Sequence, residues 1–170
     1  MREKDEQDFA LAIGRLVLQC ARLEIELIYH TAGLINATDC EQGYRKLRKG
    51  QVSTVLDEFK KLIKSRTSAG HDSLREKLSG IASDAEYVFD RRNALVHSVW
   101  VPVERNVFPY DVLKWDGKRH ARNHSQLEIA VFERTEVDEL HSKAKNLRQE
   151  LTLAMHYAFT NCSELFQTRP

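Results

Sequence analysis

Proline is nearly absent from this chain, and its placement is the strongest constraint on the fold. Among 170 residues there are three prolines: Pro102, Pro109 and Pro170. Proline breaks a helix because it lacks a backbone N–H and clashes with the preceding turn. The residues before 98, and most of those after 134, can therefore form long helices.

Apolar residues in the first of these stretches recur at alternating steps of three and four, which defines one face of an α-helix. The spacing predicts a first helix over about residues 6–31, with Gly33 as its stop. A short helix is predicted near 41–49. The next helix is expected to be capped by Ser53 and to end near Arg66.

Two longer helices are predicted further along the chain. One begins at Asp72 or Ser73 and runs to about His97. The last begins at Thr135, which can form a capping box with Asp138 three residues later.

Between these two helices the apolar pattern changes to that of strands. Residues 99–103, 110–115 and 127–132 are rich in β-branched and aromatic side chains. We therefore predict a mainly α fold, an up-and-down bundle of four to five helices forming one domain over 1–170. A small β-hairpin or sheet insertion is expected at about 98–133.

Composition excludes several classes of protein. A chain with 42% apolar and 30% charged residues is expected to be globular, and no apolar run approaches the roughly 20 residues that cross a bilayer. The first nine residues have no apolar core, so no secretory signal is expected. Cys20, Cys40 and Cys162 form no CxxC pair. We expect no disulfide framework, metal site or cofactor, and a cytoplasmic location.

One position of the long helix interrupts its apolar stripe. Arg92 stands where the spacing calls for an apolar residue, and Asn93 and His97 lie four residues apart on one helical face. Arg92 is about 100° from Asn93 around the helix axis, so all three can line one groove. The apolar members of the stripe are Leu74, Leu78, Ile81, Ala85, Val88 and Leu95.

These three residue types suit chemistry at a phosphodiester. Histidine moves protons near neutral pH. Arginine binds a phosphate through two nitrogens and stabilises charge that grows on its oxygens. Asparagine orients either partner by hydrogen bonding.

At these residues the chain resembles the HEPN superfamily (higher eukaryotes and prokaryotes nucleotide-binding domains), and in particular its stand-alone bacterial-type members. The segment Arg92-Asn93-Ala-Leu-Val-His97 matches the family motif of an arginine, a polar residue and a histidine four to six positions after the arginine. The resemblance implies a helical bundle that dimerises with two motifs facing each other across a cleft. It also implies metal-independent RNA cleavage with the 2′-hydroxyl as nucleophile. His97 would then be the acid or base, Arg92 would bind the phosphate, and Asn93 would position the groups.

Two neighbouring residues are supporting candidates. Arg91 is a second arginine within the spacing that the motif allows, so either arginine can be the active one. Glu24, at the edge of the first helix's apolar stripe, can hold the Arg92 guanidinium in place. The alternative is structural: Arg92 pairs with a carboxylate such as Glu24 or Asp84, and His97 ends a helix whose dipole favours it.

A run of cations gives the near-neutral chain, with its formal charge of +1, a local positive region. Residues 44–66 carry a net charge of +6, which can guide RNA phosphates toward a cleft. The alternative is that these cations simply lie on solvent-exposed helix faces. The RNA-binding candidates are Arg45, Lys46, Arg48, Lys49, Lys60, Lys61 and Lys64.

The motif and the charge together predict a function, with alternatives. The first hypothesis is a HEPN-type endoribonuclease that acts as a toxin or phage-defence effector. Its expected partners are RNA, a second copy of the chain, and an antitoxin or regulatory protein. The second is a non-catalytic module of the same fold that binds a nucleotide or a protein, and the third is a helical adaptor without an RNA role.

Overall fold

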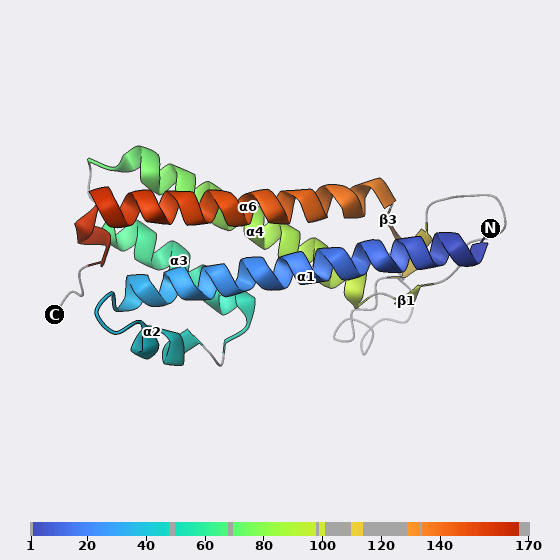
Figure 1. The fold of residues 1–170 in the computed structure, drawn as a ribbon, viewed down its shortest axis with the longest axis horizontal. Coiled ribbons are helices and arrows are strands. Elements are labelled where there is room, and N and C mark those ends of the chain that lie inside the picture. Colours follow the sequence, from blue (N-terminus) through green and yellow to red (C-terminus); the bar gives the residue numbers. More distant parts are fainter. Residues whose placement is uncertain are drawn as a thin grey trace. The chain divides into compact units, whose positions relative to one another are not determined.

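Helices dominate the computed structural model of this protein, which confirms the predicted mainly helical class (Figure 1). The residues that the structure describes are 2–47, 50–67, 70–97, 99–100, 110–113, 129–132 and 134–166. The helices are α1 (Arg2–Ile35), α2 (Cys40–Leu47), α3 (Val52–Arg66), α4 (Asp72–Val96) and α6 (Arg134–Asn161), with the 3₁₀ helix η1 (Ser163–Phe166). None of the described helices combines the length and the apolar character that crossing a bilayer requires.

The chain divides into two compact units, and the boundary between them falls within α1, α4 and α6. Unit 1 comprises residues 1–20 and 88–143, and unit 2 comprises residues 21–87 and 144–170. Each unit thus combines segments that are far apart in the sequence. The single domain over 1–170 stays a prediction.

Unit 2 is a bundle of helices in which α4 runs opposite to α1 and α6 (Figure 1). Arg66, at the end of α3, donates hydrogen bonds to the carbonyl oxygens of Leu34 and Leu165, the latter at 3.3 Å. These bonds satisfy carbonyl groups near the ends of α1 and η1 that lack helical partners. The largest fully buried side chains of unit 2 are Leu23, Leu27, Leu34, Phe59, Ile63, Leu78, Leu151 and Leu165.

A glycine allows α2 to lie close to α1 in unit 2. Gly43 is buried, and a Cβ atom at this position would collide with the carbonyl oxygen of Ala32. Because the obstacle is backbone, a larger residue at 43 would force the two helices apart.

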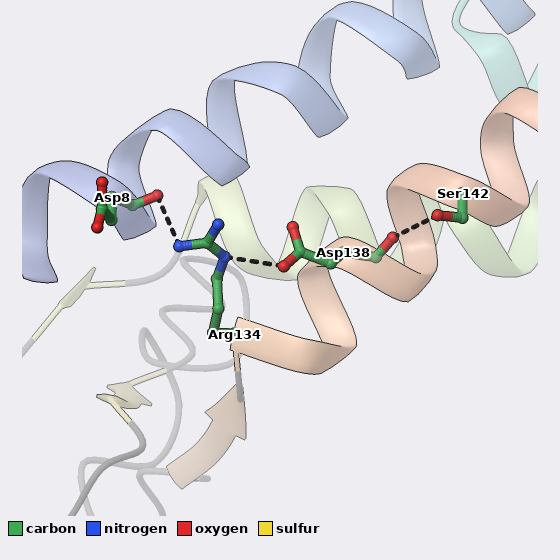
Figure 2. A network of polar contacts seen from close by, with 4 residues as sticks. All are labelled: Asp8, Arg134, Asp138 and Ser142. Carbon is green, nitrogen blue, oxygen red and sulfur yellow. Dashed lines mark hydrogen bonds and ion pairs between the residues drawn. The ribbon is translucent and has the colours of Figure 1, made fainter.

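Unit 1 joins the beginning of α1 to the end of α4 and the beginning of α6. Figure 2 shows how Arg134 of α6 connects two of these helices: its Nη1 donates to the backbone oxygen of Asp8 at 3.1 Å, and its Nε to Asp138 at 2.9 Å. The Ser142 hydroxyl donates to the Asp138 carbonyl oxygen at 2.9 Å. The buried apolar side chains here are Phe9, Ala12, Leu16, Cys20, Val88, Phe89, Leu95, Val137 and Leu140.

Three short strands form an antiparallel sheet in unit 1. They are β1 (Val99–Trp100), β2 (Tyr110–Leu113) and β3 (Ile129–Phe132), in the order β1-β2-β3. Val99 pairs with Leu113, and Val112 pairs with Ala130. The other residues of the expected insertion at 98–133 lie outside the described residues.

The predicted end of α3 near Arg66 and start of α4 at Asp72 are confirmed, but three other predictions of helix ends were wrong. Gly33 does not stop α1, which begins at Arg2 and continues to Ile35. Ser53 lies inside α3, whose N-cap is Gln51, and no side chain caps that end. The Asp138 carboxylate accepts from Arg134, and α6 begins one residue before Thr135. Local cap preferences are worth only about 1 kcal/mol, so packing of the helix faces outweighs them.

Candidate functional site

The predicted Arg92, Asn93 and His97 lie at the carboxyl end of α4, in unit 1. Arg92 and Asn93 are half-buried in its last turn, and His97 is exposed directly after it. The His97 N–H donates to the Asn93 carbonyl oxygen at 3.0 Å, so the helical turn continues to the histidine. Asn93 and His97 are therefore one turn apart on one side of the helix, as the spacing predicts.

The Arg92 side chain is held by an aromatic ring. Its Cζ lies 5.8 Å from the centroid of the Phe89 ring, within the range of a cation–π contact, and Phe89 itself is buried. Its Nε is buried and makes no hydrogen bond within the described part of the chain. A buried donor without an acceptor costs stability. Glu24 and Asp84, the carboxylates considered for Arg92, belong to unit 2, and such pairing stays a prediction.

Arg91 has a different environment from Arg92, although the two are adjacent. Its Nε donates to Oε1 of Glu136 at 3.0 Å, and its Nη2 donates to the same oxygen. Both side chains are about two-thirds buried, at 31% and 28% exposure. Arg91 thereby connects α4 to α6 within unit 1. Sequence patterns could not identify Glu136 as its partner, because the two residues are 45 positions apart.

The Arg91–Glu136 pair is expected to contribute to stability. Arg91→Ala should lower the free energy of unfolding by about 1 kcal/mol, since a half-buried charge loses its partner. Arg45→Ala is the matched control, because Arg45 pairs with Glu41 at 2.7 Å where both side chains are more than 70% exposed. Urea unfolding measures the free energy of unfolding of both variants and of the parent. Equal small losses in the two variants would show that the Arg91 pair contributes nothing beyond a surface contact.

The predicted RNA-binding cations belong to unit 2, and several of them pair with carboxylates. Besides Arg45, Lys60 reaches Glu86 at 2.7 Å and Lys61 lies 3.6 Å from Glu58. These contacts fit the alternative of solvated helix faces for part of the run. Lys46 and Lys64 are exposed, whereas Arg48 and Lys49 lie outside the described residues.

A groove between α3 and α4 in unit 2 gathers some of these cations. It has a volume of about 420 Å³ and is lined by Lys60, Lys64, Arg75, Glu76, Ser79 and Ser83. Arg75 was missed by the sequence analysis. A signal was present, because Arg75, Ser79 and Ser83 recur every four residues and so share one face of α4.

His30 is a second residue that the sequence patterns did not single out. It lies on α1 in unit 2, its side chain is 14% exposed, and its Nε2 is 3.6 Å from Oε2 of Glu26. Burial lowers the pKa of His30, and the charge of Glu26 acts in the opposite direction. The neutral imidazole is therefore favoured in the folded protein.

His30 is expected to make the stability of the fold depend on pH. The unfolded chain binds a proton at His30 near the ordinary pKa of 6.5, and the folded chain binds it less readily. The free energy of unfolding should therefore fall as the pH drops from 6.5 through the lowered pKa of the folded state. Urea unfolding between about pH 7.5 and about pH 5 measures this.

Two variants separate His30 from other acid-sensitive groups. His30→Gln should lose less stability on acidification than the parent, whereas His141→Gln on α6 in unit 1 should follow the parent. If His30→Gln loses stability as steeply as the parent, the acid sensitivity arises at other groups.

Metal and disulfide chemistry find no support in the part of the chain that is described. It contains no group of three or more His, Cys, Asp or Glu side chains arranged to hold a metal ion. All three cysteines are among the described residues, and none forms a disulfide.

Comparison of the chain with protein-family models, with curated proteins and with solved structures gives no match.

Proposed function

We propose that this protein is a metal-independent endoribonuclease of HEPN type, with Arg92, Asn93 and His97 as its catalytic residues. The observation that carries the proposal is the contrast between two adjacent arginines. Arg91 is bound to Glu136, whereas the buried Nε of Arg92 has no acceptor among the described residues. Arg92 stands five residues before an exposed histidine, and a phosphate oxygen bound there can supply the missing acceptor.

In the proposed reaction a ribose 2′-hydroxyl attacks the adjacent phosphorus and loses its proton. The bond from phosphorus to the 5′-oxygen breaks, and that oxygen takes up a proton as it leaves. The products are a 2′,3′-cyclic phosphate and a 5′-hydroxyl. His97 accepts the first proton or donates the second, Arg92 stabilises the charge on the phosphate oxygens, and Asn93 positions the reacting groups.

A second copy of the chain is part of the proposal. Among the described residues of unit 1, Leu11, Leu18 and Val96 are large apolar side chains with 52%, 53% and 41% exposure. Leu11 and Leu18 are seven residues apart and so share a face of α1, and Val96 is adjacent in sequence to His97. An exposed apolar residue next to the proposed catalytic histidine and an apolar pair on α1 suit a homodimer in which two motifs share a cleft.

The groove between α3 and α4 is proposed to bind the RNA backbone. Lys64 supplies positive charge, and Ser79 and Ser83 supply hydroxyl donors. Lys60 and Arg75 also line the groove, where they pair with Glu86 and Asp72, and Glu76 adds a negative charge. Lys46 on α2 and Lys61 on α3 are further candidates for contacts with RNA. The cellular role that we propose is a cytoplasmic toxin or phage-defence effector restrained by an antitoxin or another regulatory protein.

The decisive experiment is a cleavage assay in the presence of EDTA. The purified protein is incubated with a labelled RNA oligomer and with the DNA oligomer of the same sequence. Cleavage of RNA alone, with 2′,3′-cyclic phosphate ends, is the expected result, because DNA lacks the nucleophile. Cleavage that stops in EDTA, or that includes DNA, would contradict the mechanism. If nothing is cut, the non-catalytic binding module becomes the better proposal. Arg45 and Lys60 already pair with carboxylates of the same chain, which is compatible with a protein that does not cut RNA.

A further inference from the structure

Unit 2 contains a cavity that the proposed nuclease chemistry does not use. Its volume is about 310 Å³, which is at the lower end of the range for small-molecule sites. It lies between α1 and α6, is open on one side, and is bordered by Ala37, Cys40 and Phe166 of η1. The lining residues are Tyr29, His30, Gly33, Ala37, Cys40, Thr152, Met155, His156, Phe159 and Phe166.

Half of these lining residues carry rings. Tyr29 and His30 form an edge-to-face pair with centroids 5.4 Å apart, and Phe159 and Phe166 form another at 5.3 Å. Tyr29 and Phe159 remain 64% and 67% exposed, so much of their ring surface has no partner within the described residues. A planar aromatic molecule can use both the faces and the edges of such rings.

The polar character of the cavity restricts the ligand further. No Lys, Arg, Asp or Glu is found among the described lining residues. Nε2 of His30 is buried, makes no hydrogen bond to any described residue and lies 3.6 Å from Oε2 of Glu26, and burial lowers the pKa of this imidazole, so its neutral form is favoured. A charged ligand would lose its hydration without gaining a counter-charge from the described lining residues, whereas an uncharged heteroaromatic ring loses less hydration on binding.

We propose that this cavity binds a small, uncharged heteroaromatic molecule. The proposal is independent of the nuclease function, because its residues all belong to unit 2 and the catalytic triplet belongs to unit 1. The alternative occupant is an aromatic side chain from a second copy of the chain, and the test below distinguishes the two.

Gly33 allows the cavity to be filled without disturbing the fold. It lines the cavity inside α1, and a Cβ atom built there meets nothing within 4 Å. Leucine is also a better helix former than glycine, so Gly33→Leu should melt at the same or a higher temperature than the parent. Gly80→Leu is the matched control, because Gly80 is a helical glycine of α4 in the same unit, is exposed and is equally unobstructed.

Methionine methyl groups provide a direct readout. The chain has only two methionines, and one of them, Met155, lines the cavity. In protein labelled with ¹³C at the methionine methyls, indole is titrated as the uncharged probe. Indole-3-acetate serves as the charged analogue, and cyclohexanol as the non-aromatic one. The ring current of a bound aromatic shifts a nearby methyl signal.

The expected result is a saturable shift of the Met155 signal by indole, in the parent and in Gly80→Leu alike. In Gly33→Leu the affinity should fall at least about tenfold, and indole-3-acetate and cyclohexanol should also bind at least about tenfold more weakly than indole. No saturable shift in the parent, equal binding by Gly33→Leu, or equal binding by either analogue would overturn the proposal. The Met155 signal is also recorded without indole at increasing protein concentration. If it changes while the mass of the protein doubles, a second copy of the chain occupies the cavity, and the proposal of a small-molecule ligand is overturned.

Discussion

His97→Ala should lower the rate of RNA cleavage by about 10²–10⁴-fold, because it removes the group that moves the proton. Stability should hardly change. The imidazole is exposed, and the only bond described for His97 is made by its backbone N–H, which alanine keeps. The measurement is the initial rate on a labelled RNA oligomer in EDTA, together with the melting temperature of each protein.

The control for His97→Ala is a second histidine in the same unit. His141 lies on α6 in unit 1 and belongs to no motif, so His141→Ala should cleave RNA at the parental rate. Both variants are purified in the same way as the parent, which reveals any contaminating ribonuclease. Equal rates for all three proteins would remove His97 from the mechanism, and loss of folding in His97→Ala would make it a structural residue.

The second large effect is expected at Arg92. Arg92→Ala should reduce the cleavage rate by about 10²–10³-fold, or about 3–4 kcal/mol, as removal of one transition-state donor does in other enzymes. Arg92→Lys keeps the charge and loses the planar pair of donors, so it should recover only part of the rate. The Arg92 side chain rests on Phe89, and its truncation should lower stability by no more than about 1 kcal/mol.

Arg91→Ala completes this experiment because it should show the opposite pattern. Arg91 pairs with Glu136, so its loss should reduce stability and leave the cleavage rate close to that of the parent. Rates on RNA and urea unfolding are measured on both arginine variants. If Arg91→Ala is the slow variant and Arg92→Ala cleaves normally, the roles assigned to the two residues are wrong.

Helical spacing predicted the core of α4 well. Leu74, Leu78, Ile81, Ala85 and Val88 are all buried, and Arg92, the exception in the pattern, is half-buried. These features depend on a local period of 3.6 residues, which a sequence displays directly.

Long-range partners could not be predicted in this way. Arg91 and Glu136 meet across 45 positions of sequence, and Arg66 reaches Leu165 across 99. Nothing in the local sequence distinguishes a cation that donates hydrogen bonds to the carbonyl groups at a helix end from one that faces solvent. For the same reason the basic run at 44–66 could be recognised, but the pairing of Lys60 with Glu86 could not.

The division of the chain into units has a consequence for its synthesis on the ribosome. Unit 2 needs residues 144–170 as well as 21–87, and Leu151 and Leu165 are buried in it. The bond from Arg66 to Leu165 also requires residue 165 to be available. Unit 2 therefore cannot complete its core until the segment from residue 144 onward has left the ribosome.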